Sequence, residues 1–149
     1  MYKKIILLII SLSLYANNIE INAKLFEANK NNKIGVFSGD VKIKQNKDFL
    51  NCSKLKITID DNNKIINYIA TDVSKFSITL NKNMFSGRAN QIIYNVKNNT
   101  YELKGNVKIK ENNKELEADY ILLDQTLETY KIKSTENNKP VKLIFEIAK

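Results

Sequence analysis

The 149-residue sequence has no histidine and no tryptophan, and it has a single cysteine, Cys52, and a single arginine, Arg88. Without histidine, this chain by itself cannot form a Ser-His-Asp triad, a Cys-His pair or a histidine-ligated zinc site. One cysteine excludes an intramolecular disulfide and any multi-cysteine metal or iron–sulfur site. We therefore expect no enzymatic activity, no metal and no cofactor, and we predict that Cys52 is a small buried side chain.

Long hydrophobic runs are also scarce. The longest spans Ile5–Leu14, follows a pair of lysines and ends just before Ala16, which is the order found in secretory signal peptides. This run is too short to cross a bilayer. We expect residues 1–16 to be a signal peptide and residues 17–149 to form one domain in an extracytoplasmic space. The alternative is an uncleaved segment that anchors the chain in the inner membrane.

The formal net charge is +8, and lysine carries almost all of the excess. A nucleic-acid partner is not expected, because the chain lacks a basic cluster interleaved with aromatic residues. Anionic lipid headgroups are better-placed partners for a basic extracytoplasmic domain. A second interpretation is that lysine only keeps strand edges from associating.

Apolar residues recur at a spacing of two, the period of a half-buried β-strand, throughout the sequence. Asn-rich clusters separate these runs, and asparagine tolerates the left-handed backbone angles of tight turns. The segment 116–130 also fits a helical stripe, but an internal repeat favours strands there. We therefore predict an all-β chain with hairpin turns at 31–33, 62–64, 98–100, 112–114 and 137–139.

The internal repeat relates the block Phe-Ser-Gly-Asp-Val-Lys-Ile-Lys at 37–44 to Leu-Lys-Gly-Asn-Val-Lys-Ile-Lys at 103–110. The repeat continues in register into 50–57 and 116–123, and a partial third copy lies at 89–96. In each of these three segments a small residue, Cys52, Ala118 or Ala89, is followed by apolar residues three and five positions later. Such a slip of the alternation at a fixed place indicates a bulge or a corner between two sheets. We predict a two-sheet jelly roll of antiparallel hairpins, with small residues at the bends: Gly39, Cys52, Ala89, Gly105 and Ala118.

Two acidic motifs are candidate sites. Asp60-Asp61-Asn62-Asn63 begins like a calcium loop but lacks its glycine and its final glutamate, so a polar turn is favoured. Glu111, Glu115, Glu117 and Asp119 flank a turn and alternate with lysine, which favours a solvated strand face over a pair of catalytic carboxylates.

The periodicity leaves open whether the two sheets pack tightly or splay into an apolar trough.

The repeated blocks at 37–43 and 103–109, together with Phe-Ser-Gly-Arg-Ala at 85–89 and Leu-Glu-Ala-Asp at 116–119, resemble the OstA-like family of lipopolysaccharide transport proteins. The resemblance covers residues 19–145 and lies in the ordered set of blocks. It implies a periplasmic, twisted, open-ended β-jelly roll that shields the acyl chains of lipid A. It also implies head-to-tail self-association and contacts with like-folded domains of an inner-membrane lipopolysaccharide ABC transporter complex and an outer-membrane translocon.

Carried over to this sequence, the resemblance implies twelve lipid-lining positions that share the inward parity of their strands. They are Ile19, Ile21, Phe37, Val41, Ile43, Phe76, Ile78, Ile92, Tyr94, Val96, Val107 and Ile109. The lysines that alternate with them, at 42, 44, 108 and 110, are expected to point outward. Two other functions stay open: an inner-membrane-anchored docking component of the same system, and a structural or adhesive β module that binds protein.

Overall fold

The computed structural model describes residues 19–80, 82–134 and 140–145, and this part of the chain consists of strands and turns without a helix. The expected signal peptide and the expected turn at 137–139 lie outside the described residues. Ten strands follow one another along the chain: β1 (Ile19–Asn22), β2 (Leu25–Asn29), β3 (Ile34–Gln45), β4 (Asp48–Ile59), β5 (Ile65–Leu80), β6 (Asn83–Asn95), β7 (Thr100–Glu111), β8 (Lys114–Asp124), β9 (Thr129–Lys133) and β10 (Lys142–Phe145).

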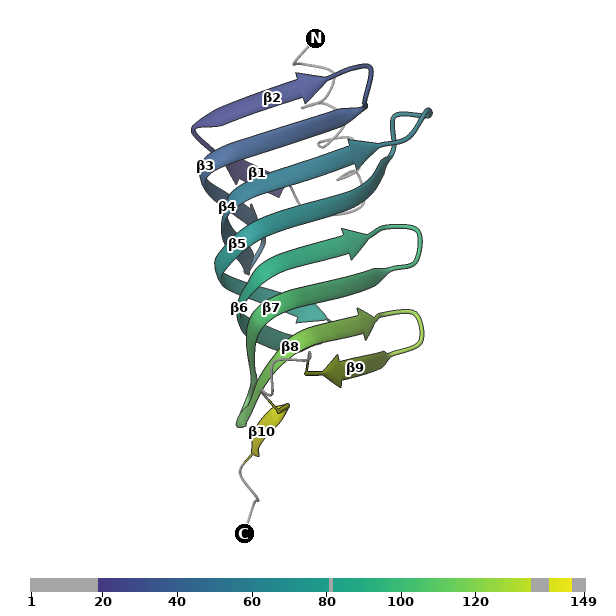
Figure 1. Ribbon diagram of the computed structural model, residues 1–149. Coiled ribbons are helices and arrows are strands. Elements are labelled where there is room, and N and C mark those ends of the chain that lie inside the picture. Colours follow the sequence, from purple (N-terminus) through teal and green to yellow (C-terminus); the bar gives the residue numbers. More distant parts are fainter. Residues whose placement is uncertain (1–18, 81, 135–139, 146–149) are drawn as a thin grey trace.

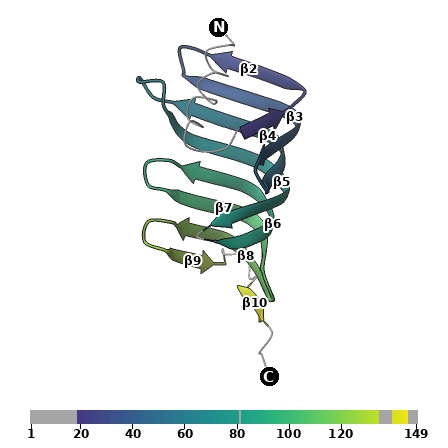
Figure 2. The same ribbon diagram turned by 180° about the vertical axis from the view of Figure 1, so that it is seen from behind.

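All ten strands belong to one antiparallel sheet with the order β1-β3-β4-β5-β6-β7-β8-β10, with β2 added to β3 and β9 added to β8. The sheet is folded over along a line that crosses the six long strands, so that each of them contributes to two layers (Figures 1 and 2). We call these layers the front and rear half-sheets, as they lie in Figure 1, and the fold line the corner. The all-β, open jelly-roll prediction is confirmed.

The corner is built from β-bulges. The register shifts between Ser38 and Val41 in the β3–β4 pair, and again between Lys104 and Val107 in the β7–β8 pair. At both places a glycine and the residue after it adopt positive φ angles, 84° and 47° at Gly39-Asp40 and 78° and 47° at Gly105-Asn106. The repeated sequence blocks therefore mark the places where β3 and β7 bend, as predicted.

Register shifts also interrupt the other long pairs: β4–β5, β5–β6 and β6–β7. On the inward face, the next buried position after Cys52 is Leu55, and the next after Ala89 is Ile92. The spacing across the bend is thus three residues where regular alternation would give two. The slip of the apolar alternation read from the sequence is thus the physical consequence of one extra residue at each bulge. Small residues occupy these places because side chains of both arms meet there.

At each end of the sheet, two short strands take the place of one long bent strand. β1 pairs with residues 42–45 of β3 and β2 pairs with residues 34–38, so β1 and β2 together follow the bend of β3. In the same way β9 and β10 pair with the two arms of β8. Among the described strands the sheet does not close on itself, and both of its ends are edge strands.

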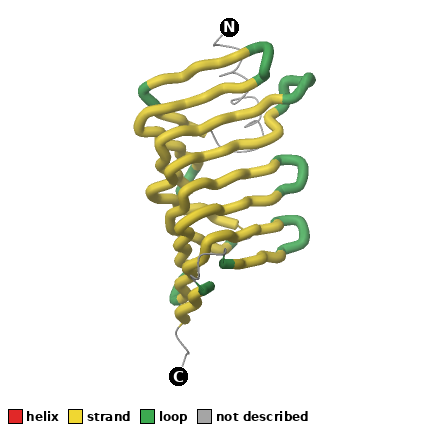
Figure 3. Tube along the Cα trace, in the orientation of Figure 1, coloured by secondary structure: helices red, strands yellow, loops and turns green. Residues whose placement is uncertain are grey.

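The hairpin loops of the front half-sheet lie together on the side opposite the corner (Figure 3). Lys33, Asn63 and Asn99 in these loops, and Asn112 in the β7–β8 turn of the rear half-sheet, have positive φ angles between 52° and 62°. This confirms the turn prediction at four of the five Asn-rich clusters. The segment 116–130 forms most of β8 and the start of β9, so the strand interpretation was right and the helical stripe was coincidental.

The two acidic motifs stabilise local structure. The Oδ1 atom of Asp60 accepts hydrogen bonds from the amides of Asn62 (2.8 Å) and Lys64 (2.9 Å), which makes a polar turn. Glu115 lies 3.7 Å from the Nζ atom of Lys108 and 3.5 Å from that of Lys110, across the β7–β8 pair. These ion pairs lie on the outer, solvated face, where each contributes little to stability.

Candidate functional site

The inner surface of the folded sheet is organised in rows, because residues paired across antiparallel strands share a face. The first front row after the corner is apolar, and we call it the aliphatic row. Its members are paired in register from β3 to β9: Phe37, Leu55, Ala70, Ile92, Leu103, Ile121 and Ile132. The six members from Phe37 to Ile121 expose between 1% and 8% of their surface, so this row is a packed core.

The next front row lies two residues further from the corner and is different in kind. Tyr68 pairs with Tyr94, and Tyr94 pairs with Tyr101, so three tyrosines stand side by side on β5, β6 and β7. The ring centroids of Tyr94 and Tyr101 are 4.5 Å apart, and those of Tyr68 and Tyr94 are 6.0 Å apart. We call this set the tyrosine ladder.

The rear half-sheet presents a facing row of apolar side chains interrupted by one glycine. In register order this row contains Ile21, Ile43, Leu50, Phe76, Gly87, Ile109, Leu116 and Leu143. A Cβ atom at Gly87 would lie 1.8 Å from the backbone oxygen of Lys108. Only glycine therefore permits the close approach of β6 and β7 at this point.

A cavity of about 440 Å³ lies between the tyrosine ladder and the rear half-sheet. Its apolar lining comes from both layers and includes Ile43, Leu50 and Ile78 behind and Leu55 and Ile92 in front. A second cavity of about 80 Å³ lies closer to β9 and β10, between Ile109, Leu116 and Ile121 among others. The two half-sheets thus form an apolar trough whose unfilled space is larger between β1 and β7 than toward β9 and β10.

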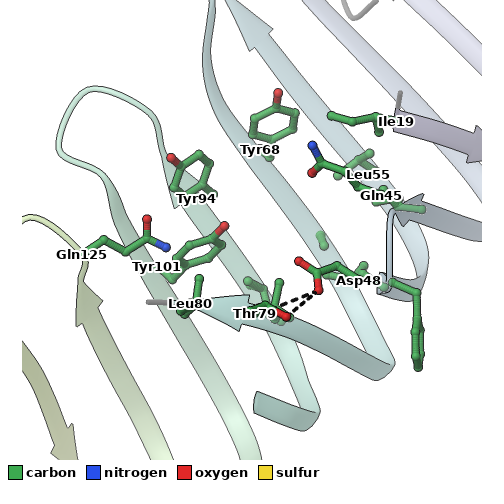
Figure 4. Close-up of a pocket in the computed structure, with 16 residues that line it drawn as sticks. Ile19, Gln45, Asp48, Leu55, Tyr68, Thr79, Leu80, Tyr94, Tyr101 and Gln125 are labelled. Atoms are coloured by element: carbon green, nitrogen blue, oxygen red, sulfur yellow. Dashed lines mark hydrogen bonds between the residues drawn. The ribbon is translucent and has the colours of Figure 1, made fainter. Parts of the chain in front are cut away.

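The cavity is polar at its mouth, the side away from the corner. Figure 4 shows the tyrosine ladder and Gln125 on one side of the space, with Asp48 and Thr79 on the other. The Oδ1 atom of Asp48 accepts hydrogen bonds from the amide (3.2 Å) and the hydroxyl (3.0 Å) of Thr79, which orient the carboxylate.

The tyrosine hydroxyls stay protonated in this environment. Burial raises the pKa of Tyr68 and of Tyr94, and the pKa of Tyr68 is raised further by the neighbouring Tyr94. Burial also raises the pKa of Tyr101 far above its ordinary value, with smaller contributions from Tyr94 and from the negative charge of Asp48. The ladder therefore presents neutral hydroxyl groups at any physiological pH.

The structure distributes the twelve lipid-lining positions over different depths. Those that line the 440 Å³ cavity are Ile19, Ile43, Ile78, Ile92 and Tyr94. Those buried in the packed part are Phe37, Val41, Phe76, Val107 and Ile109, and Ile109 also borders the small cavity. Ile21 is partly buried against the core. Val96 lies beyond the end of β6 in a turn and is 40% exposed. Lipid contact at any of these positions stays a prediction.

Sequence reasoning missed several residues of the cavity, chiefly Tyr68, Tyr101, Asp48 and Gln125. The signal for the two tyrosines was present, since both follow the spacing of two in their strands. Their position beside Tyr94 depends on the register across β5, β6 and β7, which no local pattern specifies. Asp48 and Gln125 end up at the mouth only because the sheet folds over.

The outer surface agrees with the predicted parity. Lys42, Lys44 and Lys110 are exposed, and Lys108 is ion-paired on the outer face. In the part of the chain that the structure describes, no group of three or more acidic or cysteine side chains is arranged to hold a metal ion. Cys52 is buried at the corner, and burial raises the pKa of its thiol to about 11. No helix among the described residues could cross a membrane.

The fold and the trough define an open β-jelly roll with an apolar interior that its own side chains leave partly unfilled. Residues 20–129 match the family model described as "LptA/(LptD N-terminal domain) LPS transport protein", and the chain belongs to this family. This confirms the resemblance that the repeated sequence blocks indicated.

A solved structure agrees with this assignment at the level of the fold. The crystal structure of LptH, described as the LptA-homologous periplasmic component of the lipopolysaccharide transport device of Pseudomonas aeruginosa, is similar with a TM-score of 0.73. The match has 16% sequence identity and covers 88% of this chain and 96% of that one. No curated protein matches the sequence.

Proposed function

We propose that this chain is a non-enzymatic carrier that binds lipopolysaccharide in the periplasm and covers the acyl chains of its lipid A part within the trough. The observation that carries the proposal is the 440 Å³ cavity between the half-sheets, which is apolar at its base. Each methylene group exposed to water costs about 0.8 kcal/mol, so a chain of about a dozen carbons would cost on the order of 10 kcal/mol without cover. A trough with open ends supplies that cover and still allows release.

The positions that we propose to contact acyl chains are Ile19, Ile43, Ile78, Ile92 and Tyr94, because they line the unfilled space. Phe76 is 1% exposed and lies in the packed part, so a probe or a charge placed there would report on folding. Ile78 is the better position, because it follows Phe76 on the same strand face and borders the cavity.

Site-specific photo-crosslinking in cells tests the carrier function. A crosslinker at Ile78 or Ile19 is expected to give lipopolysaccharide adducts, and one at the exposed Lys42 is expected to give none. Adducts with protein alone at the first two positions, in a correctly folded variant, would overturn the proposal. That result would favour a structural or adhesive β module.

We further propose that the two edges of the sheet bind other copies, or the like-folded domains of the inner-membrane ABC transporter complex and of the outer-membrane translocon. Edge strands expose unpaired backbone groups and readily add a strand from a partner. In β10 the side chains of Leu143, Ile144 and Phe145 are 48–60% exposed. The edge formed by β1 and β2 carries Glu20 and Glu27. The edge formed by β9 and β10 carries three lysines: Lys131, Lys133 and Lys142.

The double variant Ile144→Glu/Phe145→Glu tests head-to-tail association. We expect wild type to show a concentration-dependent rise in mass by light scattering and the double variant to lose it, because the two new charges would be buried against the edge strand of the next copy. Met84→Glu is the matched control, since Met84 is 53% exposed but lies away from the end strands. Equal association of all three proteins would contradict the edge proposal.

The N-terminal assignment is part of the same proposal: residues 1–16 are a signal peptide, and residues 17–149 form the working domain. N-terminal sequencing of the periplasmic protein tests this assignment. A chain that begins at residue 17 is expected. An intact N-terminus in the membrane fraction would instead favour the inner-membrane-anchored docking component.

A further inference from the structure

The polar mouth of the trough is not explained by covering acyl chains alone. A surface that only shields hydrocarbon needs no hydroxyls or carboxylate, and each polar group placed in a largely apolar cavity costs desolvation energy unless it is hydrogen-bonded. Yet Tyr68, Tyr94, Tyr101, Asp48 and Thr79 all border the same 440 Å³ space. They come from both half-sheets and face one another across the mouth (Figure 4).

Several of these polar atoms are available to a ligand. The hydroxyl of Tyr94 donates to the Oδ1 atom of Asn99 (3.0 Å). Within the described residues, the hydroxyls of Tyr68 and Tyr101 and the Oδ2 atom of Asp48 have no hydrogen-bond partner. The mouth thus offers two neutral donors on the front wall and one oriented acceptor on the rear wall.

The charge of the lining limits which polar groups could bind there. Among the described residues, sixteen line the cavity; none of these is a lysine or arginine, and Asp48 is the single charged one. A phosphate group would meet a carboxylate and no cation, which is unfavourable. Hydroxyl and amide groups, in contrast, are suitable hydrogen-bond partners for the tyrosine hydroxyls and the oriented carboxylate.

We propose that the tyrosine ladder and Asp48 form a polar subsite that binds uncharged hydroxyl and amide groups where acyl chains join a sugar, and that phosphate groups stay outside the trough. The proposal rests on the carrier function, since it places the acyl chains in the apolar base below. It makes the mouth a selectivity element: amphiphiles with the same hydrocarbon but a different polar junction should differ in affinity.

Two detergents with the same chain length test this subsite. Dodecyl maltoside carries uncharged hydroxyls next to its chain, whereas dodecylphosphocholine carries a phosphate. Binding of each is measured by calorimetry below its critical micelle concentration. For wild type we expect affinity for the maltoside to be at least about fivefold higher, the effect of one or two net hydrogen bonds.

The variant Tyr101→Phe/Asp48→Asn removes one free hydroxyl and the carboxylate charge while it keeps the shape of both side chains. We expect its affinity for dodecyl maltoside to fall about fivefold or more and its affinity for dodecylphosphocholine to stay equal or rise. Tyr120→Phe is the matched control, because Tyr120 lies on the outer face, where its hydroxyl donates to Glu102 (2.6 Å). It should bind both detergents as wild type does.

Equal affinity of wild type for the two detergents, or an equal loss for both in the double variant, would overturn the polar subsite. The carrier function has a separate readout, since lipopolysaccharide adducts at Ile78 would still form if the mouth were not selective. Binding of neither detergent together with absence of these adducts would refute both.

Discussion

Two neighbouring rows of the front half-sheet, two residues apart on the same strands, have opposite properties. The aliphatic row is packed, and Leu103 and Ile121 in it expose 1% of their surface. The tyrosine ladder beside it is half-buried and borders the 440 Å³ cavity. On β5, β6 and β7 the packing therefore loosens from the aliphatic row to the tyrosine ladder, whereas Ile57 of β4, which pairs with Tyr68, stays 2% exposed.

The geometry of a folded sheet explains this difference. Close to the corner the two arms are near each other, so their side chains meet and exclude water, which contributes most of the hydrophobic stabilisation. Beside the tyrosine ladder, the side chains of the two arms no longer fill the space between them, which leaves the 440 Å³ cavity. The sequence left a packed core and an open trough as alternatives, and the structure contains both at different depths.

The largest expected effect compares Phe76 and Ile78, which share a strand face at different depths. Phe76→Asp should destabilise the protein by about 5 kcal/mol or more, because it leaves a cavity and buries an unpaired charge. Ile78→Asp should cost about 1–2 kcal/mol, because the new carboxylate reaches the water of the mouth. Urea unfolding followed by circular dichroism measures both. Similar losses would mean that the mouth is as closed as the corner.

The next largest effect concerns two glycines on the inner face. Gly87→Ala should cost about 3 kcal/mol, because the added Cβ would lie 1.8 Å from the backbone oxygen of Lys108 and the strands must separate. Gly35→Ala should change the free energy of unfolding by less than about 1 kcal/mol, since its nearest neighbour is the ring of Phe26 at 3.2 Å. Thermal unfolding of both variants provides the test, and a harmless Gly87→Ala would contradict the close approach.

A third prediction uses the thiol at the corner. Burial raises the pKa of Cys52 from 9.0 to about 11. Between these values the unfolded chain loses the thiol proton and the folded chain keeps it, so stability falls as the pH rises. Wild type should lose about 2–3 kcal/mol more than Cys52→Ala between pH 8 and pH 11. If the free energies of unfolding of wild type and Cys52→Ala, measured in urea, change with pH in parallel, the corner is solvated.

The smallest effects concern the hydroxyls of the ladder. Tyr94→Phe should cost about 1 kcal/mol, because it removes the hydrogen bond to Asn99. Tyr101→Phe should change the free energy of unfolding by less than about 0.5 kcal/mol, since its hydroxyl has no partner among the described residues. Replicate urea unfolding measurements of the free energy of unfolding distinguish the two variants. A loss at Tyr101 equal to that at Tyr94 would indicate that its hydroxyl already serves the fold.

Much of the fold could be predicted from local patterns. The spacing of two marked the strands, the Asn-rich clusters marked the turns, and the repeat around Gly39 and Gly105 marked the bend. The candidate site was predicted less well. Ile78 and Phe76 have the same parity and the same apolar character, so no pattern could tell that one borders the cavity and the other is packed.

The sequence by itself determined the strand parity, the places of the bulges and the membership of the family, because each depends on residues close together in the chain. The tertiary structure alone decided the depth of each inward residue, the alignment of Tyr68, Tyr94 and Tyr101, and the position of Asp48 opposite them. These features depend on register across several strands and on the angle at the corner. Both arise from the packing of the whole sheet, which is a sum over contacts between residues distant in sequence.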